Sequence, residues 1–434
     1  MNLCENIGVN AAGHLTFAGV DTTLLAEKYG TALYLMDEDR IRYNCRLYMN
    51  AMAEAFGPGS FPLYASKACC FKRIYEIMKE EGMAIDLVSG GEIYTAVQAG
   101  FPMERSFFHG NNKTDADIAF ALESGVGYLV ADSSYELQAI EAEAARQGIC
   151  QKVLLRLTPG IDPHTYDAVA TGKVDSKFGV AIETGQAEEF ALLAHSLPHI
   201  QLEGYHCHVG SQVFDEEGSV YLDAAKIMMN FAAHMQRRHG VECRIFNIGG
   251  GFGVRYKESD PYVDIPGNIR AIAARVKALA EELQLPMPRV LMEPGRSIVA
   301  DAGMTLYRVG TVKEIPGYKN YVSIDGGMTD NPRFALYGSA YTVLCANRME
   351  EQTDFVADVA GRCCESGDII QPGVALPKPR RGDIVAVCTT GAYNYAMSSN
   401  YNRIPRPAVV MLSGGKDYLA VRRESFADLC RNDV

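Results

Sequence analysis

The stretch Phe61-Pro62-Leu63-Tyr64-Ala65-Ser66-Lys67 predicts a short buried strand with a lysine at its carboxyl end. A turn rich in glycine and proline, residues 57–59, precedes it. Buried amines are rare unless they are paired or used chemically, and burial makes an amine a better nucleophile at neutral pH. The alternative is a strand-end lysine whose amine reaches solvent. A strand that ends in a polar group recurs along this chain, which favours the functional interpretation.

The pattern around this strand predicts a parallel α/β fold. From about residue 36 to 298, apolar runs of strand length alternate with helical patterns. A capping box at residues 133–136 and the Ala- and Met-rich residues 224–238 each indicate a helix. Strands are expected at residues 63–66, 84–89, 107–110, 127–132, 153–158, 202–209, 245–248 and 290–293. Eight βα units of this length match a TIM-like (β/α)8 barrel. A doubly wound open sheet is the alternative, although it usually has fewer strands and a switch point.

Polar residues follow each predicted strand. They are Lys67, Ser89-Gly90-Gly91-Glu92, His109-Gly110-Asn111-Asn112, Asp132-Ser133, Arg156, His206 with His208 and Ser211, Gly249-Gly250-Gly251, and Glu293-Pro294-Gly295-Arg296. Active sites of (β/α)8 barrels lie at the carboxyl ends of the strands. The eight groups are therefore expected to converge on one site.

The remainder of the chain predicts an all-β domain. Helical periodicity stops near residue 298, and strand-like runs follow at residues 306–312, 321–325, 355–360, 384–387 and 409–412. We expect three parts: N-terminal strands (1–35) that join the β-domain, a barrel (36–298) and a C-terminal β-barrel or sandwich (299–434). Residues 371–381, with three prolines, are expected to form an exposed loop.

Composition narrows the function classes. The chain has 434 residues and a net charge of -12, with no basic cluster, which argues against a nucleic-acid partner. No apolar run approaches the roughly 20 residues that cross a bilayer. The first residues lack the features of a signal peptide. Twelve cysteines without a CxxC pair suggest no metal site and fit reduced thiols in a cytoplasmic protein.

A glycine run suggests the cofactor. Gly249-Gly250-Gly251-Phe252-Gly253 follows a strand and can bring backbone N–H groups to a phosphate, although such a run is equally compatible with a simple turn. It matches neither a dinucleotide site nor a P-loop, so a single phosphate is expected, with Ser211 as a further donor. A nucleophilic lysine beside a phosphate site indicates pyridoxal 5′-phosphate, whose ring nitrogen needs an acid such as Glu293. His208 is a candidate to stack on the ring; strand histidines are otherwise often satisfied core residues.

Five motifs together resemble those of the fold-type III pyridoxal-phosphate-dependent decarboxylases. They are Tyr64-Ala65-Ser66-Lys67-Ala68, His206-Cys207-His208-Val209-Gly210-Ser211-Gln212, Gly249-Gly250-Gly251, Glu293-Pro294-Gly295-Arg296 and Cys364-Glu365-Ser366-Gly367-Asp368. The resemblance covers about residues 33–406 and is greatest to the diaminopimelate decarboxylases. It implies an alanine-racemase-like barrel, a β-domain and a homodimer with shared active sites. It also implies decarboxylation of meso-2,6-diaminopimelate to L-lysine and CO2, the last step of lysine biosynthesis.

The resemblance also implies roles for individual residues. Lys67 matches the lysine that holds the cofactor as a Schiff base, His208 the histidine on its ring, and Glu293 the acid at its nitrogen. The other positions that match cofactor-binding residues are Asp86, Arg156, Ser211, Gly250, Gly251, Gly295, Arg296 and Tyr393. The positions that match substrate-binding residues are Arg296, Arg333, Tyr337, Glu365 and Tyr393. Cys364 matches a proton donor that, like Glu365, comes from the partner subunit.

These residue types suit a diacid that carries a second ammonium group. A distal carboxylate calls for a guanidinium such as that of Arg296 or Arg333, and a distal ammonium calls for a carboxylate such as Glu365. One alternative is a decarboxylase of ornithine, lysine or arginine on the same fold. A second is a non-catalytic homologue that binds the cofactor, and a third is a racemase. Cys364 by itself is also compatible with inert packing.

Overall fold

The computed structural model describes residues 3–161, 175–214 and 218–434, which form two compact units. The barrel unit contains Cys45–Gly253 and Tyr262–Gly295. The β unit contains Met1–Asn44, Val254–Pro261 and Arg296–Val434, so a short segment from inside the expected barrel range belongs to it. In the described part of the chain, no helix is both long and apolar enough to span a membrane.

The barrel unit is a closed parallel sheet. Among the described residues, eight strands pair in the order β5-β6-β7-β8-β9-β11-β12-β13, and β13 closes the ring on β5 at Leu291↔Phe61 and Met292↔Pro62. The strands are β5 (Phe61–Ala65), β6 (Ala84–Leu87), β7 (Ser106–Phe108), β8 (Tyr128–Ala131), β9 (Gln151–Thr158), β11 (Ile200–His206), β12 (Ile245–Asn247) and β13 (Arg289–Met292). The barrel prediction is confirmed and the open sheet is wrong. A short parallel strand, β10 (Val180–Ala181), adds to β9.

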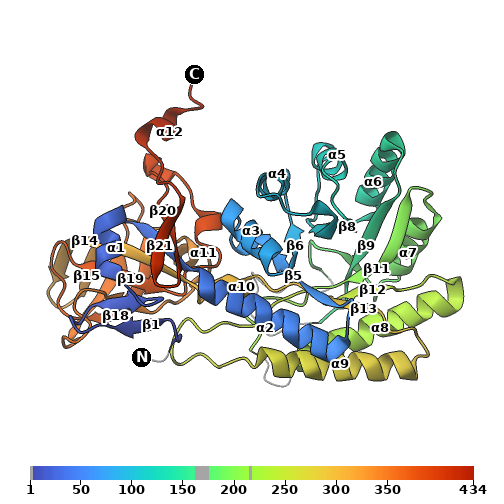
Figure 1. The fold of residues 1–434 in the computed structure, drawn as a ribbon, viewed down its shortest axis with the longest axis horizontal. Helices are drawn as coiled ribbons and strands as arrows, with labels where there is room; N and C mark the ends of the chain where they lie inside the picture. The colour runs from blue at the N-terminus through green and yellow to red at the C-terminus, as the bar shows by residue number, and fades with distance from the viewer. Residues whose placement is uncertain (1–2, 162–174, 215–217) are drawn as a thin grey trace. The chain divides into compact units, whose positions relative to one another are not determined.

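Helices alternate with these strands and lie outside them, as α4, α5 and α6 show in Figure 1. They are α2 (Glu38–Phe56), α3 (Lys72–Glu80), α4 (Gly90–Gln98), α5 (Asp115–Glu123), α6 (Ser134–Gln147), α7 (Gln186–Ser196), α8 (Ser219–His239) and α9 (Ile265–Glu282), with short 3-10 turns η1 (Ser66–Ala68) and η2 (Met103–Arg105). The predicted cap of α6 is present, because the hydroxyl of Ser133 accepts from the Glu136 N–H at 3.3 Å. The Glu136 carboxylate instead accepts from the buried Lys113 ammonium at 2.7 Å.

One apolar cluster fills the barrel. Almost every barrel strand contributes one buried side chain to it, namely Leu63, Ala84, Phe107, Val130, Leu154, Ile245 and Leu291. Burying a large apolar side chain contributes roughly 1.5–3 kcal/mol, so this layer is a major source of stability. A filled interior leaves the carboxyl ends of the strands as the place where polar groups meet.

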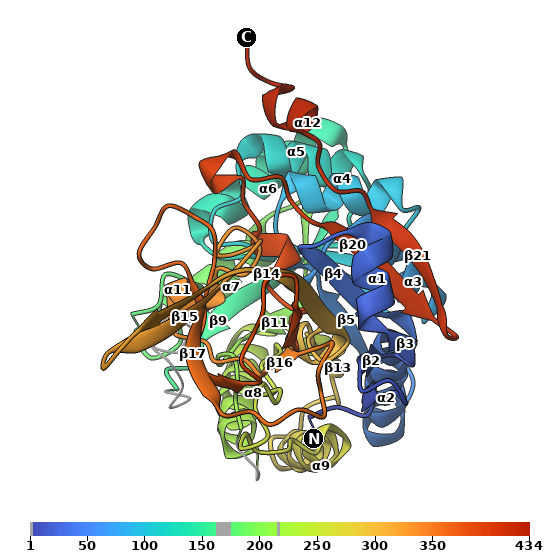
Figure 2. The same cartoon turned by 90° about the vertical axis from the view of Figure 1, so that its left-hand side faces the viewer.

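The β unit is built on a second sheet, whose path is β18-β17-β15-β14-β4-β20-β21, with β19 between β14 and β16. Its strands are β4 (Leu33–Asp37), β14 (Gly303–Ile315), β15 (Lys319–Ile324), β16 (Val343–Cys345), β17 (Phe355–Ala360), β18 (Ile369–Leu376), β19 (Ile384–Cys388), β20 (Ala408–Ser413) and β21 (Lys416–Val421). Figure 2 shows β4 between β14 and β20, with which it pairs. The helices of the unit are α1 (Thr22–Tyr29), α10 (Arg296–Val299), α11 (Arg333–Tyr337) and α12 (Phe426–Cys430), with η4 (Tyr395–Met397) and η5 (Tyr401–Arg403).

The N-terminal residues pack into this unit. Strands β1 (Ile7–Val9), β2 (Leu15–Phe17) and β3 (Val20–Asp21) form a small antiparallel sheet. Leu15, Phe17 and Leu25 share one buried cluster with Leu306 and Val410. Burial against distant strands therefore explains why the start of the chain folds with its end.

The expected exposed loop at residues 371–381 is wrong in its first half. Strand β18 runs through it and pairs antiparallel with β17, from Ala360↔Ile369 to Phe355↔Leu376. Pro372 and Gly373 lie where the register of this pair shifts, and the Gly373 N–H donates to the Asp358 carboxylate at 2.9 Å. A bulge accommodates a proline that could not donate to a regular ladder.

Candidate active site

Lys67 lies just beyond β5, in the single 3-10 turn η1. The Cys69 N–H donates to the Ser66 carbonyl at 3.0 Å, and the buried Tyr64 hydroxyl donates to the Cys69 carbonyl at 2.8 Å. The side chain of Lys67 is exposed, so the expectation of a buried ammonium is wrong. Because the chain leaves the sheet at this turn, the Lys67 side chain starts outside the strand. Its amine is therefore accessible to a reactant.

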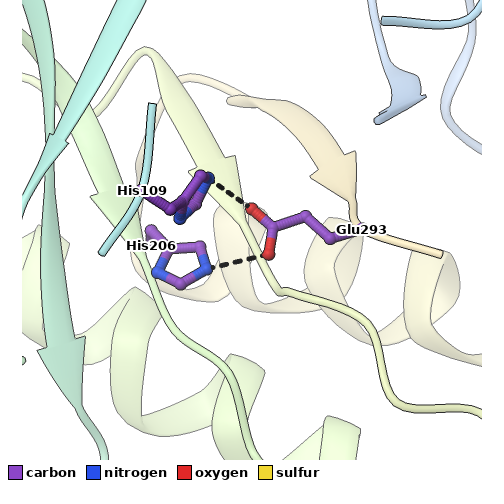
Figure 3. A group of neighbouring side chains, drawn as sticks. All are labelled: His109, His206 and Glu293. Carbon is purple, nitrogen blue, oxygen red and sulfur yellow. Dashed lines mark hydrogen bonds and ion pairs between the residues drawn. The ribbon is translucent and has the colours of Figure 1, made fainter. Parts of the chain in front are cut away.

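Glu293 follows β13, and its carboxylate faces two neighbouring histidines. Its Oε1 lies 3.0 Å from His109 Nε2 and its Oε2 lies 3.1 Å from His206 Nε2, and the two imidazoles lie side by side at the end of the carboxylate (Figure 3). The Asn247 amide donates to Oε1 at 2.7 Å. Burial alone would raise the pKa of this carboxyl, but His109 and His206 hold the pKa well below its usual range. Glu293 is therefore a carboxylate that stays ionised although it is buried.

The two histidines differ in protonation. Burial lowers the pKa of His206 to about 4, which the nearby Glu293 opposes only in part. Burial also lowers the pKa of His109, but Asp86 and Glu293 outweigh it, and the net direction is upward. His206 is thus a neutral donor to Glu293, whereas His109 is the imidazole that more readily carries a proton.

Asp86 and Arg156 complete the charged groups of the barrel mouth. Burial raises the pKa of Asp86 to about 6, and its Oδ1 has no hydrogen-bond partner among the described residues. The guanidinium of Arg156 lies 4.3 Å from the centre of the Phe178 ring, and its Nε lies 3.9 Å from Asp132 Oδ1. An unsatisfied buried acceptor is costly, so the Asp86 oxygen is suited to a donor on a bound molecule.

His208 is fixed by the glycine run. The Gly250 N–H donates to His208 Nδ1 at 3.2 Å, and burial lowers the pKa of this imidazole well below its usual range. A Cβ at Gly250 would lie 2.0 Å from the Glu293 carbonyl oxygen, and one at Gly251, whose φ is +122°, 2.2 Å from the Gly210 carbonyl oxygen. Only glycine fits at these two positions. The N–H of Gly250 is used by His208, so the importance of Gly250 to the local structure lies in its missing side chain.

Ser211 and Gly295 lie next to these groups in the same unit. Ser211 lies two residues before Val213, whose N–H donates to the Gly251 carbonyl at 2.9 Å. This hydrogen bond joins the segment that contains Ser211 to the glycine run. The Ala65 N–H donates to the Pro294 carbonyl at 3.0 Å, and a Cβ at Gly295 would lie 2.9 Å from that of Ala65. The segment after Glu293 therefore packs against the strand that leads to Lys67.

A second group of predicted residues lies in the β unit. The guanidinium of Arg296 lies 4.8 Å from the centre of the Tyr393 ring, and that of Arg333 lies 5.3 Å from the same ring. Arg333 also lies 5.4 Å from the ring of Tyr337, and Arg296 Nη1 donates to the Tyr256 hydroxyl at 2.8 Å. Both arginines are only 7% exposed. Two buried guanidinium groups around one tyrosine form a place for an anion.

The backbone of Tyr393 supports a functional interpretation. Its φ is +60°, in the left-handed region that a tyrosine rarely adopts. Such a conformation costs on the order of 1–3 kcal/mol and persists only where neighbouring structure enforces it. It aims the ring at the two arginines.

Cys364 and Glu365 lie on an exposed loop of the β unit. The buried Asp368 fixes this loop, because its carboxylate accepts from the N–H groups of Met328 at 2.6 Å and Cys363 at 2.7 Å. The Cys364 N–H donates to Asn402 Oδ1 at 2.8 Å. Cys364 and Glu365 are both exposed, whereas Cys363 is buried. The alternative that Cys364 is a buried packing residue is therefore wrong. The buried position belongs to its neighbour Cys363.

Sequence reasoning missed three contributors to these sites. Asn247 and Tyr256 were not singled out, and His109 was named only as a residue that follows a strand. His109 and His206 carried a usable signal, since both lie where a barrel strand ends. Tyr256 carried none, because its contact with Arg296 joins segments that are 40 residues apart.

Comparison with known proteins agrees with this arrangement. The family model described as pyridoxal-dependent decarboxylase, pyridoxal binding domain, matches residues 40–300. The chain is 45% identical over 425 residues to the diaminopimelate decarboxylase of Bacillus subtilis (strain 168), covering 98% of this chain and 96% of that protein.

Solved structures give the same result. The crystal structure of diaminopimelate decarboxylase from M. jannaschii in complex with L-lysine is 31% identical, with a TM-score of 0.90, covering 100% of this chain and 99% of that one. A lysine/ornithine decarboxylase from Vibrio vulnificus, complexed with putrescine, is 25% identical, with a TM-score of 0.75, covering 94% and 99%. The chain belongs to the diaminopimelate decarboxylase family of pyridoxal-dependent decarboxylases.

Proposed function

We propose that this protein decarboxylates meso-2,6-diaminopimelate to L-lysine and CO2 with pyridoxal 5′-phosphate as cofactor. The observation that carries the substrate assignment is a pair of buried guanidinium groups, those of Arg296 and Arg333. Both contact the ring of Tyr393. Such a pair suits a carboxylate at the far end of the substrate.

The barrel unit fits the cofactor by the chemistry of its residues. Lys67 offers an accessible amine as the attachment point, and Glu293 offers an ionised carboxylate for a protonated ring nitrogen. The glycine run and Ser211 would hold the phosphate, His208 would lie on the ring, and the unsatisfied Asp86 oxygen would accept from a donor on the ring. When bound, the cofactor supplies an electron sink for the pair left by the broken Cα–carboxyl bond.

The charge on Glu293 is what the chain adds to this chemistry. His109, His206 and Asn247 donate to it or lie in ion-pair contact with it, so the carboxylate stays ionised although it is buried. A fixed negative charge beside the ring nitrogen would keep that nitrogen protonated, so that the ring could accept an electron pair. These contacts exist before substrate arrives, so little reorganisation is required.

The exposed loop is proposed to return the proton. The thiol of Cys364 would protonate Cα after CO2 leaves, and Glu365 would accept from the distal ammonium of the substrate. Both side chains are exposed and so are available to the site of a second chain. The protein would then act as a homodimer in which each site uses Cys364 and Glu365 of the other subunit.

The rival function is decarboxylation of a basic amino acid, as named for the Vibrio vulnificus relative. A substrate of that kind presents a distal cation and no distal carboxylate. It would be repelled by Arg333, which is buried and positively charged. The arginine pair therefore favours the diacid.

The test is CO2 release by the holoenzyme from meso-diaminopimelate, D- and L-lysine, ornithine and arginine. Release from meso-diaminopimelate alone, with L-lysine as product, is expected. Arg333→Gln should lower kcat/KM for meso-diaminopimelate by roughly 30-fold or more, because an unpaired carboxylate costs about 2–5 kcal/mol. Release only from a basic amino acid would retain the reaction type and overturn the substrate. No release from any of them would favour a non-catalytic homologue.

A further inference from the structure

We propose that Glu188, His234 and His239 form a binding site for one divalent transition-metal ion, such as Zn²⁺ or Co²⁺. The three residues lie on the surface of the barrel unit, Glu188 in α7 and the two histidines in the last turns of α8. None of them takes part in the site described above.

The ligand atoms already converge. His234 Nε2 lies 2.9 Å from Glu188 Oε2, and His239 Nε2 lies 2.7 Å from Oε1. One ligand atom from each of the three residues lies within 4.8 Å of the other two. Metal–nitrogen and metal–oxygen bonds of about 2.0–2.1 Å in a tetrahedron separate neighbouring ligand atoms by about 3.3 Å. Small side-chain rotations would therefore open the cluster enough to admit an ion.

The two helices favour a cation between these groups. Glu188 lies in the first turn of α7, where the positive end of the helix dipole stabilises a carboxylate, and His234 and His239 lie near the end of α8, where the negative end attracts a cation. An ionised carboxylate with two imidazoles is a common zinc ligand set.

An ion could reach the cluster and keep an open coordination position. A cavity of about 650 Å³ is lined by Glu188, His234, Asn230 and Asp223, among others. The His234 side chain is 43% exposed. Glu188 and His234 face this cavity, so a bound water has room to serve as the fourth ligand beside the three protein ligands.

One neighbouring cation competes with a metal. Arg238 Nη1 lies 3.6 Å from Glu188 Oε1, but its side chain is 65% exposed and free to turn toward solvent. Arg238→Gln should therefore leave metal binding intact or strengthen it. The competing interpretation is a cluster of hydrogen bonds that only ties α7 to α8, in which case metal ions would bind no better here than elsewhere.

The experiment is titration of the holoenzyme with Co²⁺, followed by visible absorption and by equilibrium dialysis. The wild type should bind one equivalent with the weak visible bands of nitrogen and oxygen ligands. Strong near-ultraviolet bands would instead indicate the cysteine thiolates. Glu188→Gln, His234→Ala and His239→Ala should each weaken this binding at least about tenfold.

Controls separate a lost ligand from a lost fold. His199→Ala removes a comparable exposed pair, in which His199 Nδ1 lies 2.7 Å from Glu141 Oε1, and should leave Co²⁺ binding unchanged. The variants Glu188→Gln, His234→Ala, His239→Ala and His199→Ala should all retain the decarboxylase activity of the wild type. Undiminished binding by a His234→Ala/His239→Ala double variant, or no saturable binding by the wild type, would overturn the proposal.

Discussion

His109→Leu tests whether the imidazole of His109 keeps Glu293 charged. The substitution removes the contact between His109 Nε2 and Glu293 Oε1, which are 3.0 Å apart. Two charges at that distance interact by about 5.5 kcal/mol at an effective dielectric of 20, and the loss of solvation on burial offsets part of it. A hydrogen bond to a charged group has a net value of about 1.5–3 kcal/mol, and we take this range as the loss.

The expected result is a shift in pH dependence. That loss corresponds to about one to two pH units, by which the acid limb of the kcat/KM profile should move upward. Activity near neutral pH should change only a few-fold, because His206 at 3.1 Å and Asn247 at 2.7 Å still hold the carboxylate. Glu293→Gln is the comparison. It removes the charge at every pH and should lower kcat by roughly 10²–10³ without such a shift.

The assay is CO2 release from meso-diaminopimelate across the pH range, with cofactor occupancy checked by absorbance. An acid limb that does not move in His109→Leu would refute the role of His109 in holding the charge. A loss as deep as that of Glu293→Gln at every pH would show instead that His109 contacts the reacting groups.

Three further predictions follow from the same geometry. Lys67→Ala should abolish turnover and the absorbance of bound cofactor, whereas Cys364→Ala should retain the absorbance but lose turnover. Mixing the two variants should restore activity if the sites are shared between subunits. No recovery would place each site within one chain. Gly250→Ala should lower the thermal midpoint and weaken cofactor binding, since its Cβ would lie 2.0 Å from a carbonyl oxygen, whereas Gly310→Ala, with its nearest neighbour at 3.7 Å, should do neither. The pKa of His206 falls from 6.5 to about 4 on folding, so the unfolded chain takes up this proton first as pH falls; stability is full above pH 6.5 and is lost toward pH 4. His206→Asn should flatten that dependence in thermal melts at a fixed scan rate, and an unchanged slope would contradict it.

Local pattern determined much of this protein. The alternation of apolar runs and helical segments predicted every barrel strand, because almost every strand carries its own apolar residue into one shared core. The place of the polar residues at the strand ends predicted that His109, His206 and Glu293 meet, since parallel strands bring their carboxyl ends to one face, whereas Arg296 from the same set belongs to the β unit. Strand β17 was predicted with the bounds that it has, Phe355–Ala360, because its apolar run is short and bounded by turns.

Other features needed contacts between distant segments. The prolines and glycine at residues 372–379 concealed β18, which forms only because β17 supplies a partner and a bulge absorbs Pro372. The exposure of Lys67 depends on one turn of 3-10 helix that the apolar run did not indicate.

The charge state of Glu293 is the clearest example of a property that tertiary structure decided. The sequence by itself identified the residue as an acid at a strand end. Its ionisation in a buried place depends on His109 from β7's carboxyl end, His206 from β11 and Asn247 from β12, which only closure of the barrel brings to one carboxylate. Electrostatic interactions act over a few ångströms in space whatever the separation along the chain, so pattern predicts the residue and the fold determines its chemistry.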